Sequence, residues 1–137
     1  MELTLSGINW FAVLASIAAG QVISTVWFVV LFGDPWAREY GAADKKQHTA
    51  EVPGYTYAVQ VLCTVALVLS LAILQQWLSV GSLTDALKLG FLVAVGFCIA
   101  TGVPGQAFLK RWRVAAIAFG CQATMIIAIS LILGQWR

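Results

Sequence analysis

Three cysteines are the residues of this sequence best suited to metal or redox chemistry. Cys63, Cys98 and Cys121 fall in three different apolar segments. Counted from one common end of these segments, they lie about 8, 11 and 7 residues along, so as helical residues their depths differ by roughly 6 Å or less. A three-thiolate cluster is therefore geometrically allowed. We favour a packing role and predict no metal, because cysteine is a small, commonly buried residue and the chain has no Cys-x-x-Cys motif.

A polar group after the first apolar segment is the next candidate site. It consists of Asp34, Arg38, Glu39 and His48, and a membrane enzyme could use the first three for catalysis or ligand binding. Helix capping and solvation account for the same residues, because Asp is a preferred cap and exposed charges contribute little to stability. We therefore predict no catalytic residues and do not expect an enzyme.

Two short motifs predict helix boundaries. In Leu31-Phe-Gly-Asp-Pro-Trp-Ala-Arg-Glu-Tyr-Gly41, Gly33 is expected to end the first helix in a left-handed conformation. Asp34 is then expected to cap a second helix that begins at Pro35. Ser82-Leu-Thr-Asp85 resembles a capping box, which predicts the start of the third long helix.

The restarted helix is expected to lie in the membrane interface. Trp36 and Tyr40 are four residues apart and share one face of it, and Gly41 is expected to end it. Residues 42–53 are polar and are expected to form a loop. The candidate residues of this interfacial segment are Asp34, Trp36, Arg38 and Glu39.

Two amide side chains, Gln21 and Gln122, lie near the middle of apolar segments. A buried amide without a partner is costly, so we expect both to face the interior of a helix bundle. Their expected partners across helices are each other, Thr64 or Thr101. A polar permeation path is the functional alternative, but we favour interhelical bonding, because polar contacts commonly hold membrane helices together.

The elements that must position these residues are long and apolar. Of the 137 residues, 61% are hydrophobic and 10% are charged, whereas soluble domains carry roughly 25% charged residues. About 20 apolar residues span the hydrocarbon core as a helix, and four segments are that long: about 8–32, 55–78, 86–109 and 114–135. The sequence predicts an all-α, polytopic integral membrane protein. It has one domain, with four transmembrane helices, a short interfacial helix after the first and a loop at 33–54.

Positive charges predict the orientation of these helices. Cytoplasmic loops carry an excess of Lys and Arg, and six of the eight such residues fall in segments 33–54 and 110–113. We therefore place both termini outside and these two loops in the cytoplasm. The six basic residues suit anionic headgroups better than nucleic acid. The expected partners are thus the lipid bilayer and other membrane protein chains, with no nucleic acid.

Small residues recur at every fourth position on three of the expected helices. Such stripes let helix backbones approach closely in lipid. Pro104 in the third helix removes a backbone amide and predicts a kink near Ala100–Pro104. Broken helices line sites in some transporters, but we favour a packing role here. The stripes are Ala12, Ser16, Gly20 and Ser24; Gly90, Ala94, Cys98 and Gly102; and Ala116, Gly120, Thr124 and Ala128.

The sequence lacks the chemistry of several classes of membrane protein. No acidic or basic residue lies well inside an apolar segment, whereas proton-coupled carriers usually have one there. No histidine lies in these segments, so ordinary histidine ligation of haem is excluded. The chain also has no glycine-rich phosphate loop. We therefore expect no bound cofactor.

Aromatic and glycine positions give the chain a family resemblance. They are Ile8-Asn9-Trp10, Trp27-Phe28-x-x-Leu31-Phe32-Gly33-x-x-Trp36 with Gly41 beyond, and more loosely Phe108-Leu-Lys-Arg-Trp112. The pattern resembles the bacterial membrane protein family Domain of Unknown Function 1761, which usually has Tyr where Phe28 stands. The resemblance implies a four-span fold in the bacterial inner membrane. It implies no catalytic residues.

Two functions remain in competition. The first is an accessory or structural subunit that acts through helix packing in a homo-oligomer or a larger membrane complex, as the stripes of small residues suggest. The alternative is a small oligomeric channel or carrier for a weakly polar solute. It is motivated by Gln21, Gln106 and the expected kink at Pro104.

Overall fold

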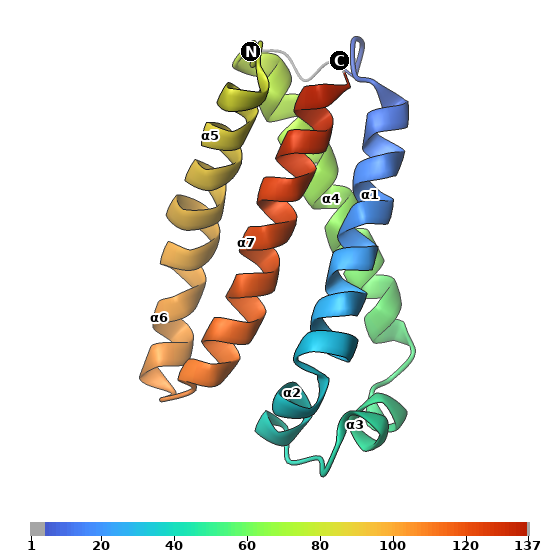
Figure 1. Ribbon diagram of the computed structural model, residues 1–137, viewed down its shortest axis with the longest axis vertical. Helices are drawn as coiled ribbons and strands as arrows, with labels where there is room; N and C mark the ends of the chain where they lie inside the picture. Colours follow the sequence, from blue (N-terminus) through green and yellow to red (C-terminus); the bar gives the residue numbers. More distant parts are fainter. Residues whose placement is uncertain (1–4, 137) are drawn as a thin grey trace.

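Four long apolar helical spans form the body of the protein (Figure 1). The computed structural model describes residues 5–136, and the spans are Trp10–Leu31, Tyr55–Trp77, Leu83–Phe108 and Trp112–Gln135. Each is long enough to cross a bilayer. The prediction of an all-α, multi-pass membrane protein is therefore confirmed.

Two of the spans are continuous α-helices and two change their winding. The second and fourth spans are α4 (Tyr55–Trp77) and α7 (Trp112–Gln135). The first consists of α1 (Trp10–Thr25) and the π-helical segment η1 (Val26–Leu31). The third consists of α5 (Leu83–Val93), the π-helical segment η2 (Ala94–Ile99) and α6 (Ala100–Phe108). Two short helices, α2 (Gly33–Glu39) and α3 (Lys45–Glu51), connect the first two spans.

The last helix, α7, is the centre of the arrangement. It packs against α1 and α4 and also against α5, η2 and α6. Figure 1 shows α7 between α1 and the α5–α6 span, with α4 crossing behind. Residues of α7 such as Ile129 and Cys121 are almost completely buried. The hydrophobic core therefore follows one face of α7.

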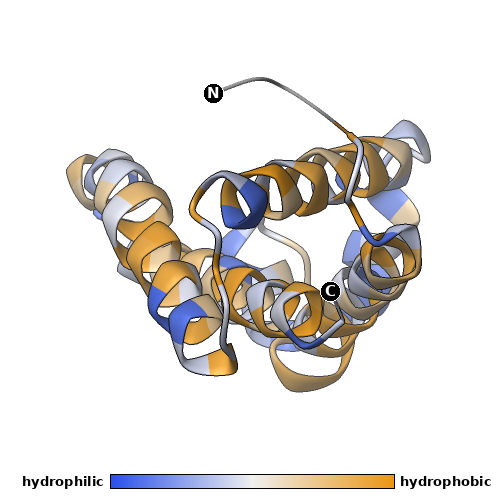
Figure 2. Ribbon diagram, turned by 90° about the horizontal axis from the view of Figure 1, so that it is seen from above, coloured by the Kyte–Doolittle hydropathy of each residue, from blue (hydrophilic) through white to orange (hydrophobic). Residues whose placement is uncertain are grey.

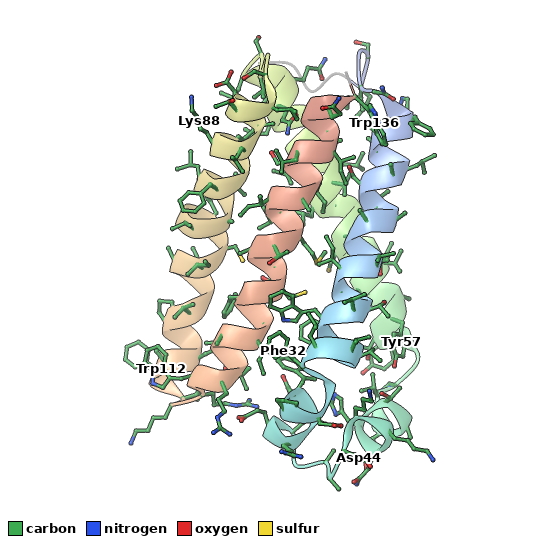
Figure 3. All side chains as sticks on the ribbon, viewed as in Figure 1. Phe32, Asp44, Tyr57, Lys88, Trp112 and Trp136 are labelled. Atoms are coloured by element: carbon green, nitrogen blue, oxygen red, sulfur yellow. The ribbon has the colours of Figure 1, made fainter. Side chains whose placement is uncertain are left out.

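The outer surface of the spans is apolar. Large side chains such as Leu14, Leu62 and Phe97 are more than 60% exposed, and hydrophobic colours cover much of the helices in Figure 2. Aromatic residues mark both ends of the spans, with Trp136 at one end and Trp112 at the other (Figure 3). This distribution is the one expected of helices surrounded by lipid.

Glycines mark the places where helices come closest. A Cβ atom on Gly90 would lie 2.9 Å from the Cβ of Ser130 and 3.2 Å from the Cα of Ile127. A Cβ on Gly20 would lie 2.8 Å from a methyl group of Thr64 on α4. The contact at Gly90 involves backbone, so a neighbouring side chain cannot relieve it by rotating.

A polar contact joins three spans near the end where the termini lie. The Nε2 atom of Gln75 on α4 donates to the carbonyl oxygen of Ser130 at 2.8 Å and to its Oγ at 2.9 Å. Ser130 Oγ in turn donates to the carbonyl oxygen of Ala86 on α5 at 2.7 Å. Gln75 and Ser130 are both buried. A buried amide is thus satisfied while α4, α7 and α5 are held together.

The cap predicted at Ser82 is confirmed. Its side chain accepts a hydrogen bond from the Asp85 amide at 3.1 Å, and α5 starts at Leu83. Lys88 makes an exposed salt bridge to Asp85 at 3.4 Å. The predicted end of α2 at Gly41 is also confirmed, because Gly41 has φ +81°, a left-handed conformation that favours glycine.

Two predictions for the segment after the first span are wrong. Gly33 has no positive φ; it opens α2 and is buried, and a Cβ there would lie 2.9 Å from the Lys45 side chain. Asp34 does not cap α2. Its Oδ1 accepts from the backbone amide of Lys45 at 3.0 Å, the first residue of α3. Gly33 is therefore explained by close packing against Lys45, and Asp34 by its bond to the first amide of α3.

The predicted loop at 42–53 contains the helix α3. Asp44 is its N-cap and accepts from the Gln47 amide at 2.8 Å, while Gln47 Oε1 accepts from the Ala43 amide at 3.0 Å. An Asp followed three residues later by Gln is a helix-start signal. The polar composition of this segment concealed that signal.

We expect Gly90→Val to destabilise the protein by about 1 to 3 kcal/mol, because the added atoms meet the α7 backbone and overpack the contact. Thermal unfolding in detergent measures the effect. The matched control is Gly96→Val, since a Cβ at Gly96 meets only the Leu92 side chain, at 4.0 Å. Equal melting temperatures for the two variants would contradict the role assigned to the α5–α7 contact.

Candidate functional site

A cleft of about 690 Å³ lies within the depth of the spans, toward the end that carries α2 and α3. Residues of α1, α4, η2, α6 and α7 line it, together with Phe28 of η1, Trp36 of α2 and Val93 of α5. We call it the intramembrane cleft. Its lining residues with hydrogen-bonding side chains are Ser24, Trp36, Gln60, Thr64, Thr101 and Gln122 and the three cysteines.

Helix order creates the cleft. α4 packs against α1 and α7, whereas η2 and α6 pack against α7. At the α2–α3 end, α4 and α6 lie on opposite sides of α7 in Figure 1. The cleft therefore separates α4 from η2 and α6, with α7 as its floor.

The three cysteines all line this cleft. Cys63 is exposed, Cys98 is half-buried and Cys121 is buried, and all three are free thiols. Within residues 5–136, no group of three or more His, Cys, Asp or Glu side chains is placed so that it could hold a metal ion. The fold therefore brings the cysteines to one cavity without forming a ligand cluster.

Hydrogen bonds between helices order one wall of the cleft. Gln60 Nε2 on α4 donates to Ser24 Oγ on α1 at 3.2 Å. Ser24 Oγ donates to Met125 Sδ on α7 at 3.1 Å. The Thr64 hydroxyl donates to the backbone carbonyl of Gln60 at 2.9 Å. This series of hydrogen bonds connects α1, α4 and α7 through neutral groups only.

Sequence reasoning did not single out Gln60 or Gln75. Both are amides inside the uncharged segment 55–78, the same signal that drew attention to Gln21 and Gln122. Both bond across helices. A consistent search for amides in apolar segments would have found them.

The expected pairing of Gln21 with Gln122 does not occur. Gln122 Oε1 accepts from Cys98 Sγ across the α7–η2 contact at 3.1 Å. Gln21 lies outside the cleft lining, and its Nε2 atom is buried without a hydrogen-bond partner in the described part of the chain. The Thr101 hydroxyl donates to the backbone carbonyl of Phe97 on its own helix instead of to an amide.

Two of the small-residue stripes lie at helix contacts. On α1, all four members are buried: Ala12, Ser16, Gly20 and Ser24. On the third span, two members are buried and two are half-buried: Gly90, Ala94, Cys98 and Gly102. Gly102 lies against the ring of Phe119. These stripes therefore face other spans of the same chain.

The stripe on α7 is placed differently. Gly120 and Ala128 are half-buried, whereas Ala116 and Thr124 are exposed. Gly120 lies under the indole of Trp27, and Trp27 Nε1 donates to the carbonyl oxygen of Ile117 at 2.8 Å. Most of the α7 core residues lie on other faces, so this stripe is only partly covered by the chain itself.

The four interfacial candidates do not converge on one site. Trp36 lines the cleft, and its ring centroid lies 4.8 Å from that of Phe28 and 5.0 Å from that of Tyr40. Asp34 caps α3, and Arg38 is exposed. The carbonyl oxygen of Glu39 accepts from Arg111 at 3.1 Å.

Arg111 attaches the short helix α2 to the start of α7. Besides the bond to Glu39, its guanidinium carbon lies 5.2 Å from the centroid of the Tyr40 ring, a cation–π contact. Lys45 makes a similar connection to the first span, because its Nζ donates to the carbonyl oxygen of Val29 at 3.1 Å. The Arg111 contacts hold α2, which carries the cleft residue Trp36, against the start of α7, and the Lys45 contact holds α3 against the first span.

A family comparison covers almost the whole chain. The family model described as "Protein of unknown function (DUF1761)" matches residues 11–134. The chain belongs to this family. The DUF1761 match includes all four spans apart from the end residues Trp10 and Gln135, and it includes α2, α3 and every residue that lines the cleft. No curated protein and no solved structure matches the chain.

Proposed function

We propose that the protein binds a neutral, weakly polar molecule in the intramembrane cleft, as a carrier or binding protein within the bilayer. The observation that carries the proposal is the cleft itself, about 690 Å³ within the depth of the spans and lined by amides, hydroxyls and thiols but by no charged side chain. Ligand pockets mostly measure roughly 300 to 1,000 Å³ and combine an apolar lining with a few polar groups. The cleft fits that description.

The composition of the lining favours binding of a neutral molecule over catalysis. Aromatic and aliphatic side chains such as Phe28, Leu67 and Phe119 form most of the wall. An ion would require compensating charge in a low-dielectric setting. A neutral molecule requires only hydrogen bonds and apolar contact, and the cleft offers both.

Charge supports an orientation with α2 and α3 in the cytoplasm of a bacterial cell and both termini outside its inner membrane. The α2–α3 end carries six basic residues: Arg38, Lys45, Lys46, Lys110, Arg111 and Arg113. Basic residues in short loops favour the cytoplasmic side, where anionic headgroups attract them. The bilayer is then the first partner of the protein, and nothing in this charge pattern requires nucleic acid.

The second candidate function is that of an accessory subunit in a homo-oligomer or larger membrane complex. Ala116 and Thr124 on α7 favour it, because they are small, exposed and on one stripe. Small residues let a helix of another chain approach closely in lipid. The two functions are compatible, since this stripe and the cleft lie on different faces of α7.

Cys63→Trp is expected to reduce ligand retention strongly, because Cys63 lines the cleft and a bulky indole there would obstruct it. The protein is extracted with its surrounding lipid by an amphipathic copolymer, and bound molecules are identified by mass spectrometry. Wild-type protein should retain a neutral molecule above its abundance in the membrane. Cys63→Ala is the matched control and should retain it too. Equal retention by Cys63→Trp would argue against the cleft as the binding site.

The orientation is tested with two single-cysteine additions in exposed positions. Ala43→Cys lies in the turn between α2 and α3, and Gly81→Cys lies before α5. A membrane-impermeant maleimide added outside intact inner membrane should label Gly81→Cys and leave Ala43→Cys unlabelled until the membrane is disrupted. The reverse pattern would invert the proposed topology.

Thr124→Leu and Ala116→Leu are expected to weaken any assembly through α7, because a larger side chain separates the two helix backbones. The mass of the complex in native lipid particles measures this. Ala66→Leu is the matched control, since Ala66 is exposed on α4 and outside the stripe. A wild-type mass equal to that of a monomer without partners would contradict the accessory role.

A further inference from the structure

Two amide side chains in the intramembrane cleft have hydrogen-bonding capacity that the protein does not use. Gln60 on α4 donates through Nε2 to Ser24, and Gln122 on α7 accepts through Oε1 from Cys98. No partner is present among the described residues for the Gln60 Oε1 acceptor or the Gln122 Nε2 donor. Both residues line the same cleft. The Gln60 Oε1 atom and the Gln122 Nε2 atom, neither of which has a partner in residues 5–136, therefore belong to residues of one shared cavity.

The hydroxyl protons of the cleft are not available to the Gln60 Oε1 acceptor. The Ser24 hydroxyl donates to Met125 Sδ, and the Thr64 hydroxyl donates to the backbone carbonyl of Gln60. The Thr101 hydroxyl donates to the backbone carbonyl of Phe97. All three hydroxyl protons are thus committed inside the chain.

These unpaired amide atoms lie within the membrane-spanning part of the protein. Gln122 lies ten residues along α7 from Trp112, which corresponds to about 15 Å of helix. At such depth an amide without a partner is unfavourable, because hydrocarbon offers no hydrogen bonds. A ligand that enters the cleft from the surrounding lipid can provide them.

A hydroxyl group matches this pair of amides. It donates one hydrogen, which the Gln60 Oε1 acceptor requires, and it accepts one, which the Gln122 Nε2 donor requires. A carbonyl group only accepts and leaves Gln60 unsatisfied. A carboxylate or phosphate brings charge that no residue of the lining compensates.

Hydrogen bonds connect Gln60 to a residue of α7 that lies one helical turn from Gln122. Gln60 is connected through Ser24 to Met125, and Met125 lies three residues after Gln122 on α7, on the same helix face. Apolar side chains, including Leu67, Val93 and Phe97, continue the cleft beyond them. The lining therefore has a polar end and an apolar remainder.

We propose that the ligand of the cleft is an uncharged lipid with a free hydroxyl group, such as a long-chain alcohol or a diacylglycerol. The hydroxyl lies between Gln60 and Gln122, and the chain passes between α4 and η2–α6 into the bilayer. This inference rests on the proposed binding function and specifies its substrate class.

The test uses photocrosslinking of the full chain in phosphatidylcholine nanodiscs. The probes are hexadecanol and hexadecane, each carrying a diazirine at the same chain position. The alcohol is expected to label peptides of α4 and η2–α6 about tenfold more than the alkane, as the net worth of one or two hydrogen bonds implies. Gln122→Leu and Gln60→Leu should each reduce this preference to near unity. Gln21→Leu, outside the cleft, should keep it.

The outcomes separate the inference from the function on which it rests. Equal labelling of the cleft by both probes, unchanged in Gln122→Leu, overturns the hydroxyl assignment and leaves the binding function standing. Labelling by neither probe above the level of Cys63→Trp overturns both. Competition by a carbonyl-only decylquinone as effective as that by hexadecanol also overturns the hydroxyl assignment. Gln60 and Gln122 are both exposed, so Gln60→Leu and Gln122→Leu each remove one amide without altering the buried core.

Discussion

The cost of an unpaired polar group in hydrocarbon is the main constraint on the packed end of this structure. Hydrocarbon offers no partners, so backbone groups bond within helices and side-chain amides bond across them. Gln75 donates to Ser130, and Ser130 donates to the Ala86 carbonyl. These bonds pair buried polar groups of three spans. They are possible only because Gly90 lets α5 approach α7 closely. Close packing and polar satisfaction therefore depend on each other near the termini.

The other end of the spans is organised differently. There α4 and α6 lie on either side of α7 (Figure 1). Residues of all three helices line the intramembrane cleft. Both π-helical segments lie at this level, and η1 contributes Phe28 and η2 contributes Phe97 and Cys98 to the cleft. Such segments are frequent at functional sites. The tightly packed end thus holds the bundle together, and the open end carries the candidate site.

The sequence was sufficient for the spans but not for the cleft. Runs of about 20 apolar residues permit few alternatives to a transmembrane helix, and Ser82 and Gly41 have local roles that depend on their immediate neighbours. Gly33 and Asp34 were assigned wrong roles because their partner, Lys45, lies on the next helix. The cleft depends on the order of helices around α7, which no local pattern specifies. For the same reason the sequence did not predict that Gln122 bonds to Cys98 instead of to Gln21.

The central position of the last helix has a consequence for biogenesis. α1 and α4 contact each other directly, whereas α5, η2 and α6 find their main interhelical partner in α7. During synthesis the first two spans can associate as soon as both are inserted, while the third must wait in the bilayer for the fourth. Its exposed glycine-rich face is then open to other inserted helices. Another helix can therefore most easily bind this face in the interval after the third span is inserted and before the fourth is translated.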